Sequence, residues 1–304
     1  NSVEDIRKIA SAVQEHSLDL LQANHTLSGI DIALYDLLGK SKGVPVFDLL
    51  GQKKVYPKLP YASQLFGDSP EDTFRKAERT KDAGYRAVKF GWGPFGKGGL
   101  RTDIAHLYAA REGIGKDAYL MVDAGTVWGE DVSKARRRLA ALEEIGAYWL
   151  EEPFINGALQ PYRDLSLATP RVALAGGEGC NSFVQAQAMI AYAGLDFIQI
   201  DVGRIGGITP SNRVADFARS RKVTYVNHTF TSHLALSASL QVFAGSESDF
   251  LCEYPIELQP LAKAISRESI LPQGDGLVHV PRGPGLGVSI DTDALREYLV
   301  EASI

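Results

Sequence analysis

The sequence has little cysteine, no long apolar run and no strong excess of charge of either sign. Its two cysteines, Cys180 and Cys252, make neither a disulfide framework nor the spacing of a zinc site, which favours a reducing compartment such as the cytoplasm. No apolar run reaches the roughly 18 residues of a membrane span, and no signal peptide is visible. A net charge of −5 and a pI near 5.7 give no electrostatic attraction to nucleic acid or to an anionic membrane. We therefore expect neither as a partner.

What the sequence does have is 304 residues, 45% of them hydrophobic, which is enough to bury one large core. Three acidic residues each close a short apolar run of the kind that is typical of buried strands: Asp123, Glu151 and Glu178. They lie 28 and 27 residues apart, and each interval holds a helical pattern, for example from residue 131 to residue 145. A strand, a helix and the next parallel strand need about that length.

Three carboxylates at the C-terminal ends of successive parallel strands would meet on one face of the sheet, where barrel enzymes keep their chemistry. Oxygen ligands that converge from neighbouring strands suit a hard divalent cation, most simply Mg²⁺. The alternative is three unrelated acids at strand ends. Glu152 is a second candidate ligand beside Glu151, but adjacent residues of a strand point to opposite faces.

The same spacing of apolar runs continues on both sides of the three acidic residues. Further short apolar runs predict strands at residues 59–63, 87–90, 197–201, 223–228 and 250–253. The last residues of the later runs, Asp201, His228 and Glu253, follow Glu178 at steps of 23, 27 and 25 residues. This near-constant period predicts an α/β fold of the (β/α)8 type, a TIM-like (β/α)7β barrel, rather than an open doubly wound sheet.

The expected barrel takes up residues 55–275. Residues 1–54 show helical patterns only, which predicts part of a capping domain, mostly helical, whose remainder lies outside this sequence. Residues 276–304 contain the glycine- and proline-rich stretch 281–287 and are expected to return to the barrel or the capping domain. Trp92, Phe95 and Trp128 fall on loops after the second and third strands, where they either wall a pocket or pack the loops.

An ordered set of short motifs carries a family resemblance over about residue 20 to the end. The motifs are Val122-Asp123, Trp149 to Pro153, Gly177-Glu178, Asp201 to Thr209, Asn227-His228, Glu253 and Gly283 to Gly287. In this order the chain resembles the enolase superfamily and, within it, the mandelate racemase subgroup, which includes many acid-sugar dehydratases. The resemblance implies a small-molecule carboxylate substrate and a homo-oligomer.

The resemblance also implies a role for each polar residue at the strand ends. The Mg²⁺ ligands would be Asp123, Glu151 and Glu178, binding a substrate carboxylate and stabilising the enediolate formed when the α-proton leaves. His228 is similar to the family's base, and Asp201 beside it would fix its tautomer and raise its basicity. Glu253 looks like the acid that hydrogen-bonds the carboxylate side of the substrate.

The second strand departs from the subgroup's pattern. Where many members carry Lys-x-Lys, this chain has Lys89-Phe90-Gly91, and glycine cannot move a proton. We therefore expect a Mg²⁺-dependent dehydratase of an aldonate or aldarate, with a racemase or epimerase as the alternative. Lys89 would contact the substrate carboxylate or neutralise the acids. Two further alternatives are a Schiff-base enzyme that uses Lys89 and a catalytically idle metal-binding barrel.

Overall fold

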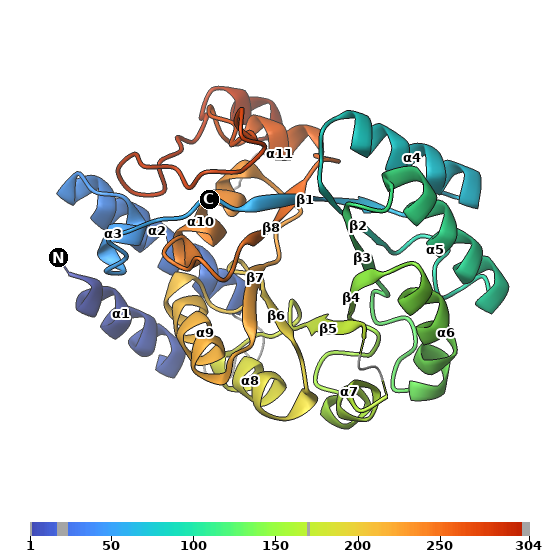
Figure 1. Cartoon of the computed structure of the whole chain (residues 1–304). Coiled ribbons are helices and arrows are strands. Elements are labelled where there is room, and N and C mark those ends of the chain that lie inside the picture. Colours follow the sequence, from blue (N-terminus) through green and yellow to red (C-terminus); the bar gives the residue numbers. More distant parts are fainter. Residues whose placement is uncertain (1, 17–23, 169–170, 300–304) are drawn as a thin grey trace.

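The computed structural model describes residues 2–16, 24–168 and 171–299. Its centre is a ring of parallel strands surrounded by helices (Figure 1). The strands are β1 (Leu59–Leu65), β2 (Ala87–Gly91), β3 (Tyr119–Asp123), β4 (Ala147–Glu151), β5 (Ala173–Gly176), β6 (Phe197–Ile200), β7 (Thr224–Asn227) and β8 (Leu251–Pro255). The predicted (β/α)7β barrel is confirmed.

A helical segment connects each strand to the next. These are α4 (Pro70–Asp82), α5 (Leu100–Ile114), α6 (Val132–Glu144), α7 (Leu159–Ser166), α8 (Phe183–Ala188) with the π-helical turn Met189–Ala193, α9 (Ile208–Arg221) and α10 (His233–Phe243). Local sequence sets their starts. At the start of α4, the hydroxyl of Ser69 accepts a hydrogen bond from the amide of Asp72, and Pro70 is the first helical residue. At the start of α6, the carboxylate of Asp131 accepts hydrogen bonds from the amides of Ser133 and Lys134.

The inside of the barrel is built in two layers by the alternation of side chains along each strand. Every strand contributes to an apolar layer made of Leu59, Tyr61, Ala87, Met121, Trp149, Ala175, Phe197, Val226 and Leu251. Two positions further along the same inward faces come Lys89, Asp123, Glu151, His228 and Glu253. One period-two pattern therefore supplies both the floor of the barrel and the polar groups above it.

The ring is not closed by backbone hydrogen bonds all round. The strands pair in the order β7-β6-β5-β4-β3-β2-β1-β8, and among the described residues β7 and β8 share no ladder. At this seam the buried amide of Asn227 takes the place of a peptide group. Its nitrogen donates to the carbonyl of Glu253 at 3.2 Å, and its oxygen accepts from the amide of Glu253 at 3.0 Å.

Three helices precede the barrel: α1 (Val3–His16), α2 (Asn24–Lys42) and α3 (Val46–Leu49). They lie beside α9 and α10 (Figure 1). Buried Asp31 of α2 accepts hydrogen bonds from the amide and hydroxyl of Thr209, at 3.0 and 2.6 Å. Gly207 makes this approach possible, because a Cβ there would lie 2.4 Å from the Asp31 carboxylate and its φ is +104°.

The C-terminal part contains the short helix α11 (Pro260–Ala264) and the 3₁₀ turn Ala294–Tyr298. Isolated β-bridges join Val278 of this part to Lys58, just before β1, and Gly285 to Pro45, just before α3. The division of the chain after residues 54 and 275 stays a prediction, as do a homo-oligomer and a cytoplasmic location.

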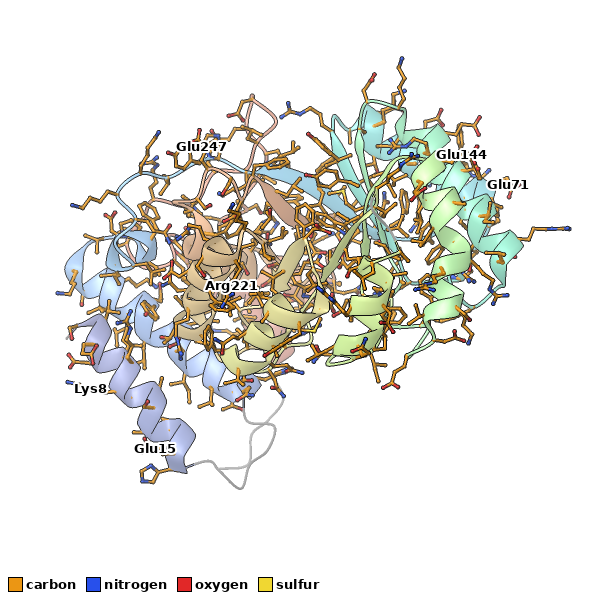
Figure 2. The ribbon with its side chains drawn as sticks, turned by 60° about the horizontal axis from the view of Figure 1, so that its bottom comes forward. Lys8, Glu15, Glu71, Glu144, Arg221 and Glu247 are labelled. Carbon is orange, nitrogen blue, oxygen red and sulfur yellow. The ribbon has the colours of Figure 1, made fainter. Side chains whose placement is uncertain are left out.

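Charged side chains cover the outside of the molecule, as the six labelled examples in Figure 2 illustrate. In the described part of the chain, no helix combines the length and the apolar character that crossing a bilayer requires.

Lys58 is buried at the floor of the barrel, close to the buried Asp249. Lys58, just before β1, donates hydrogen bonds to the carbonyls of Ser246 and Asp249 at 2.5 and 2.8 Å, and its ammonium lies 4.7 Å from the ring centre of Phe243. Burial lowers the pKa of Lys58 to about 8, although the nearby charge of Asp249 opposes the shift.

Candidate active site

Three carboxylates meet at the C-terminal end of the barrel. Asp123 and Glu151 are the last residues of β3 and β4, and Glu178 follows β5 by two residues. Each is buried, and their ligand atoms all lie within 4.8 Å of one another. Opposite ligands of a Mg²⁺ octahedron are about 4 Å apart, so the donor set and its spacing fit this ion. Glu152 is not in the cluster found among the described residues, which favours Glu151 of the two sequence candidates.

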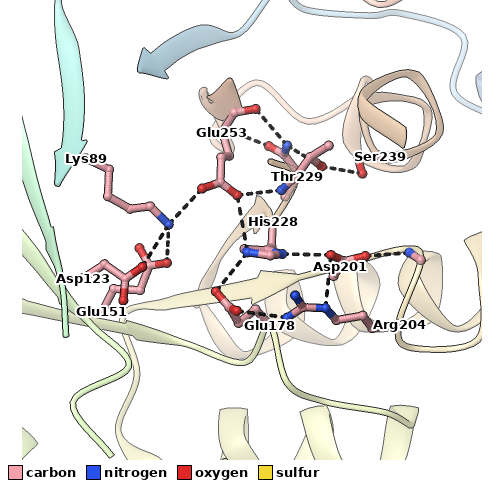
Figure 3. A network of polar contacts seen from close by, with 12 residues as sticks. Lys89, Asp123, Glu151, Glu178, Asp201, Arg204, His228, Thr229, Ser239 and Glu253 are labelled. Carbon is pink, nitrogen blue, oxygen red and sulfur yellow. Dashed lines mark hydrogen bonds and ion pairs between the residues drawn. The ribbon is translucent and has the colours of Figure 1, made fainter. Parts of the chain in front are cut away.

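Lys89 crosses the barrel from β2 to the acids (Figure 3). Its ammonium lies 2.5 Å from Glu151, 2.8 Å from Glu253 and 3.5 Å from Asp123. Burial alone would lower the pKa of Lys89, but these three carboxylates outweigh burial and hold the pKa well above its usual value. The lysine is therefore a fixed positive charge.

The remaining oxygens of the acids are oriented by neighbouring groups. The indole of Trp149 donates to Glu151 at 2.9 Å, and the amide of Gly125 donates to Asp123 at 2.7 Å. Burial raises the pKa of Asp123 to about 6 and that of Glu151 to about 8, although Lys89 opposes both shifts. The cluster carries more negative charge than Lys89 neutralises, as a site for an added cation requires.

His228 faces the acids from the end of β7. Its Nδ1 lies 2.8 Å from Asp201, and its Nε2 lies 3.0 Å from Glu178. Burial would lower the pKa of His228, but Glu178, Glu253 and Asp201 hold it well above its usual value. The histidine and carboxylate that the sequence paired are thus in contact, and the charge of Glu178 matters more than that of Asp201.

Glu253 completes the ring of charges from β8. It is fully buried and accepts a hydrogen bond at 2.6 Å from the amide of Thr229, whose hydroxyl in turn contacts Ser239 at 2.8 Å (Figure 3). His228 lies 3.9 Å from one carboxylate oxygen of Glu253, and Lys89 lies 2.8 Å from the other. All seven residues singled out in the sequence therefore lie in one network.

The structure gives a packing explanation for glycine at position 91 that the sequence did not reveal. A Cβ built on it would lie 2.8 Å from the Cβ of Asp123 and 2.9 Å from a carboxylate oxygen. With the neighbouring atoms in these positions, a Cβ at position 91 would require Asp123 to shift.

The network forms the wall and base of a pocket of about 480 Å³. Of the three loop aromatics, Phe95 and Trp128 are buried and pack against each other with ring centres 6.0 Å apart. Trp92 instead lines the pocket and is half exposed. The two alternatives from the sequence thus apply to different residues.

Comparison with known families decides which fold family this site belongs to. A model described as "Enolase C-terminal domain-like" matches residues 72–294, and "Mandelate racemase / muconate lactonizing enzyme, N-terminal domain" matches residues 3–51. The chain belongs to the enolase superfamily. This confirms the family resemblance inferred from the motifs, and with it an enzyme of this superfamily.

Two solved structures of the enolase superfamily show how far the likeness extends. A predicted mandelate racemase from Rhodobacter sphaeroides is 51% identical with a TM-score of 0.96, over 100% of this chain and 78% of that one. A racemase from Streptomyces coelicolor A3(2) with bound magnesium is 26% identical with a TM-score of 0.85, over 98% of this chain and 79% of that one.

Two curated relatives are named for activities on sugar acids. D-galactarolactone cycloisomerase of Agrobacterium fabrum is 31% identical, over 90% of this chain and 73% of the relative. D-gluconate dehydratase of Thermoproteus tenax is 29% identical, over 91% of this chain and 56% of the relative. The chain is thus shorter than both.

Sequence reasoning missed one charged member of this enolase-superfamily site. Arg204 lies 2.9 Å from Glu178 and 3.5 Å from Asp201, so it holds two carboxylates from adjacent strands (Figure 3). Its position three residues after Asp201 was the available signal. The partner on Glu178 could not be found, because that contact spans two separate loops.

Proposed function

We propose that the protein is a lyase, a Mg²⁺-dependent dehydratase of a sugar acid. The observation that carries the proposal is that the His228–Asp201 pair lies beside the acid cluster in a pocket of about 480 Å³. A pocket of this size accommodates a six-carbon acid. The dehydratase relative adds support from an independent direction.

Asp123, Glu151 and Glu178 would hold the metal. When bound, Mg²⁺ supplies positive charge for the substrate carboxylate and for the negative charge that gathers there as the α-proton leaves. Lys89 supplies a second, permanent positive charge beside the same acids. Both charges act where water is largely excluded, which makes them more effective than in solution.

His228 is the base. Its bond from Nδ1 to Asp201 fixes the tautomer in which Nε2 accepts a proton. Nε2 takes the α-proton, the bond from the β-carbon to its hydroxyl breaks, and protonated His228 returns the proton to that hydroxyl, which leaves as water. The resulting enol tautomerises to a 2-keto-3-deoxy acid.

Racemisation is the weaker candidate, because it needs a base on each face of the α-carbon. On the side of β2 the described chain offers Gly91 and Lys89, and the raised pKa of Lys89 keeps it protonated. The same protonation argues against a Schiff base, which needs a neutral amine. An idle barrel would have no use for the His228–Asp201 pair.

Replacing His228 tests the base. His228→Asn keeps a hydrogen-bonding group and should lower turnover of the true substrate by about 10²- to 10⁴-fold. A library of sugar acids, incubated in deuterated water with Mg²⁺, identifies that substrate by a keto-acid product that carries deuterium at the carbon that lost its hydroxyl. His233→Asn, at a buried histidine outside the pocket, is the matched control and should keep turnover. Near-normal turnover in His228→Asn would place the base elsewhere.

Replacing a carboxylate tests the metal site. Glu178→Gln should weaken Mg²⁺ binding in isothermal titration calorimetry by at least about tenfold, because a neutral amide is a poorer ligand for a hard cation. Glu130→Gln, at an exposed acid, should leave binding unchanged. Unaltered Mg²⁺ affinity in Glu178→Gln is the result that contradicts the assignment.

A further inference from the structure

Four side chains at the base of the pocket form a closed ring of contacts: His228, Glu178, Arg204 and Asp201. His228 contacts Glu178 through Nε2 at 3.0 Å and Asp201 through Nδ1 at 2.8 Å. Arg204 contacts the same two acids, Glu178 through a terminal nitrogen at 2.9 Å and Asp201 through Nε at 3.5 Å (Figure 3). Each carboxylate therefore lies between the histidine and the arginine.

The carboxylate oxygens are divided among these partners. In Glu178, Oε1 accepts a hydrogen bond from Arg204 and Oε2 lies next to His228. In Asp201, Oδ2 faces both His228 and Arg204, while Oδ1 accepts from the amide of Gly203 at 2.7 Å. One arginine can serve both acids, because the guanidinium presents its N–H groups in a rigid plane.

Glu178 needs this support more than the other two proposed ligands. Asp123 and Glu151 are the last residues of β3 and β4, whereas Glu178 lies two residues beyond the end of β5. In the proposed reaction Nε2 of His228 accepts a proton from the substrate, so it cannot donate to Glu178 at the same time. Arg204 then keeps Glu178 in place.

The loop that carries Arg204 is itself anchored to α2. Two residues after Arg204, the amide of Gly206 donates to the hydroxyl of Ser28 at 2.9 Å. Further along, the amide of Thr209 donates to Asp31 at 3.0 Å. Because α2 holds this backbone from outside the barrel, the guanidinium extends toward the two acids from a fixed starting point.

We propose that Arg204 is a positioning residue, whose one guanidinium holds Glu178 for Mg²⁺ and Asp201 for the base. The inference rests on the proposed function, which assigns Glu178 to the metal and Asp201 to the orientation of His228. It makes metal binding and proton transfer depend on the same side chain. Removing a partner that orients a metal ligand typically lowers metal affinity or activity by about 10- to 100-fold.

Two other roles for Arg204 lead to different expectations. A mere counterion would oppose the binding of a second cation, so its removal would tighten Mg²⁺ binding. A substrate contact is the other role, since Arg204 lines the pocket, and its removal would raise KM and leave Mg²⁺ affinity unchanged. For a positioning residue, removal weakens Mg²⁺ binding and lowers kcat.

Mg²⁺ affinity without substrate is the first test. Arg204→Met keeps much of the side-chain length but removes both contacts, and should weaken Mg²⁺ binding in isothermal titration calorimetry by about tenfold or more. Arg219→Met removes the same charge from an exposed arginine that is paired with Asp216 outside the pocket, and should keep the affinity. Unchanged or tighter Mg²⁺ binding in Arg204→Met overturns the proposal.

A conservative variant separates position from charge. Arg204→Lys keeps the positive charge, but a single ammonium cannot reproduce the planar contacts to two carboxylates. Mg²⁺ affinity should therefore still fall, by about threefold or more. If circular dichroism shows that Arg204→Met does not fold, this variant decides the question, and wild-type affinity in it overturns the proposal.

A double-mutant cycle tests whether Arg204 acts through Glu178. Glu178→Gln removes the carboxylate that Arg204 is proposed to hold, so adding Arg204→Met to it should weaken Mg²⁺ binding no further. Losses that multiply in the double variant would mean that Arg204 acts on the metal by another route, and would contradict the proposal.

Kinetics test the contact with Asp201. At saturating Mg²⁺, Arg204→Met should lower kcat on the true substrate by about tenfold and leave KM within about threefold. A raised KM with unchanged kcat identifies a substrate contact and overturns the proposed positioning of Asp201. If the wild type turns over no sugar acid, the proposed function is rejected, and the Mg²⁺ measurements alone decide the role of Arg204.

Discussion

Two lysines are buried at opposite ends of the barrel, and their pKa values move in opposite directions. Lys89 at the mouth is surrounded by carboxylates, which overcome the effect of burial and raise its pKa well above the usual value. Lys58 at the floor donates to two carbonyls, and burial lowers its pKa to about 8. Both side chains are almost fully shielded, at 3% and 1% exposure.

The difference shows that burial does not by itself assign a lysine to function. The two carbonyls that accept hydrogen bonds from Lys58 are neutral, and the charge of Asp249 opposes the effect of burial only in part. Lys58 therefore fastens chain segments together at the floor, with a lowered pKa. At the C-terminal end of the barrel, carboxylates keep Lys89 charged. Because these acids outnumber Lys89, negative charge remains there to bind another cation. Identical substitutions at the two ends should therefore have different consequences.

The largest effect is expected for Lys89→Met. Loss of the charge beside Asp123, Glu151 and Glu253 should lower kcat by about 10²- to 10³-fold, as for the removal of other preorganised electrostatic groups. Because the acids then lack their counterion, saturating Mg²⁺ should raise the melting temperature of this variant more than that of the wild type. Steady-state kinetics and thermal denaturation with and without Mg²⁺ measure both. Normal turnover would limit Lys89 to neutralising the acids.

The same substitution at the floor should act on stability alone. Lys58→Met leaves the carbonyls of Ser246 and Asp249 without their donor, which should cost about 1 to 3 kcal/mol of unfolding free energy. Turnover per folded molecule should not change, since Lys58 lies at the far end of the barrel from the pocket. Denaturant unfolding and kinetics on one preparation provide the comparison. A large loss of kcat would mean that the two ends are coupled.

The smallest effect is a pH dependence confined to the floor. The pKa of Lys58 is about 8 in the folded protein against 10.5 for an unburied lysine, so between these values the unfolded chain binds more protons than the folded one. Stability contributed by this group therefore rises with pH across that window. Relative to Lys58→Met, the wild type should gain on the order of 2 kcal/mol from about pH 7.5 to about pH 10. A flat difference would mean that Lys58 has an ordinary pKa.

The barrel and its charged residues could be predicted because both depend on spacing along the chain. Strand and helix lengths set the repeat that brings Asp123, Glu151 and Glu178 to one end, and alternation within each strand sets which acid faces inward. These rules act within about 30 residues, so one sequence suffices to apply them.

What the sequence did not reveal depends on contacts between distant segments. Lys58 reads as an ordinary surface lysine until the loop at residues 246–249 is placed beneath it. Gly91 reads as a lost catalytic residue until the side chain of Asp123 is placed next to it. The pairing of Arg204 with Glu178 likewise arises only when two strand-to-helix loops meet.

The seam between β7 and β8 has a consequence for how the barrel could be redesigned. Elsewhere adjacent strands are joined by ladders of backbone hydrogen bonds, but here the side-chain amide of Asn227 makes two of the bonds across the gap. Evolution or engineering can therefore alter part of this join by replacing a single side chain. The seam lies between the strands that carry His228 and Glu253. A substitution that changes the closure of the barrel there should therefore also change the distance between these two residues.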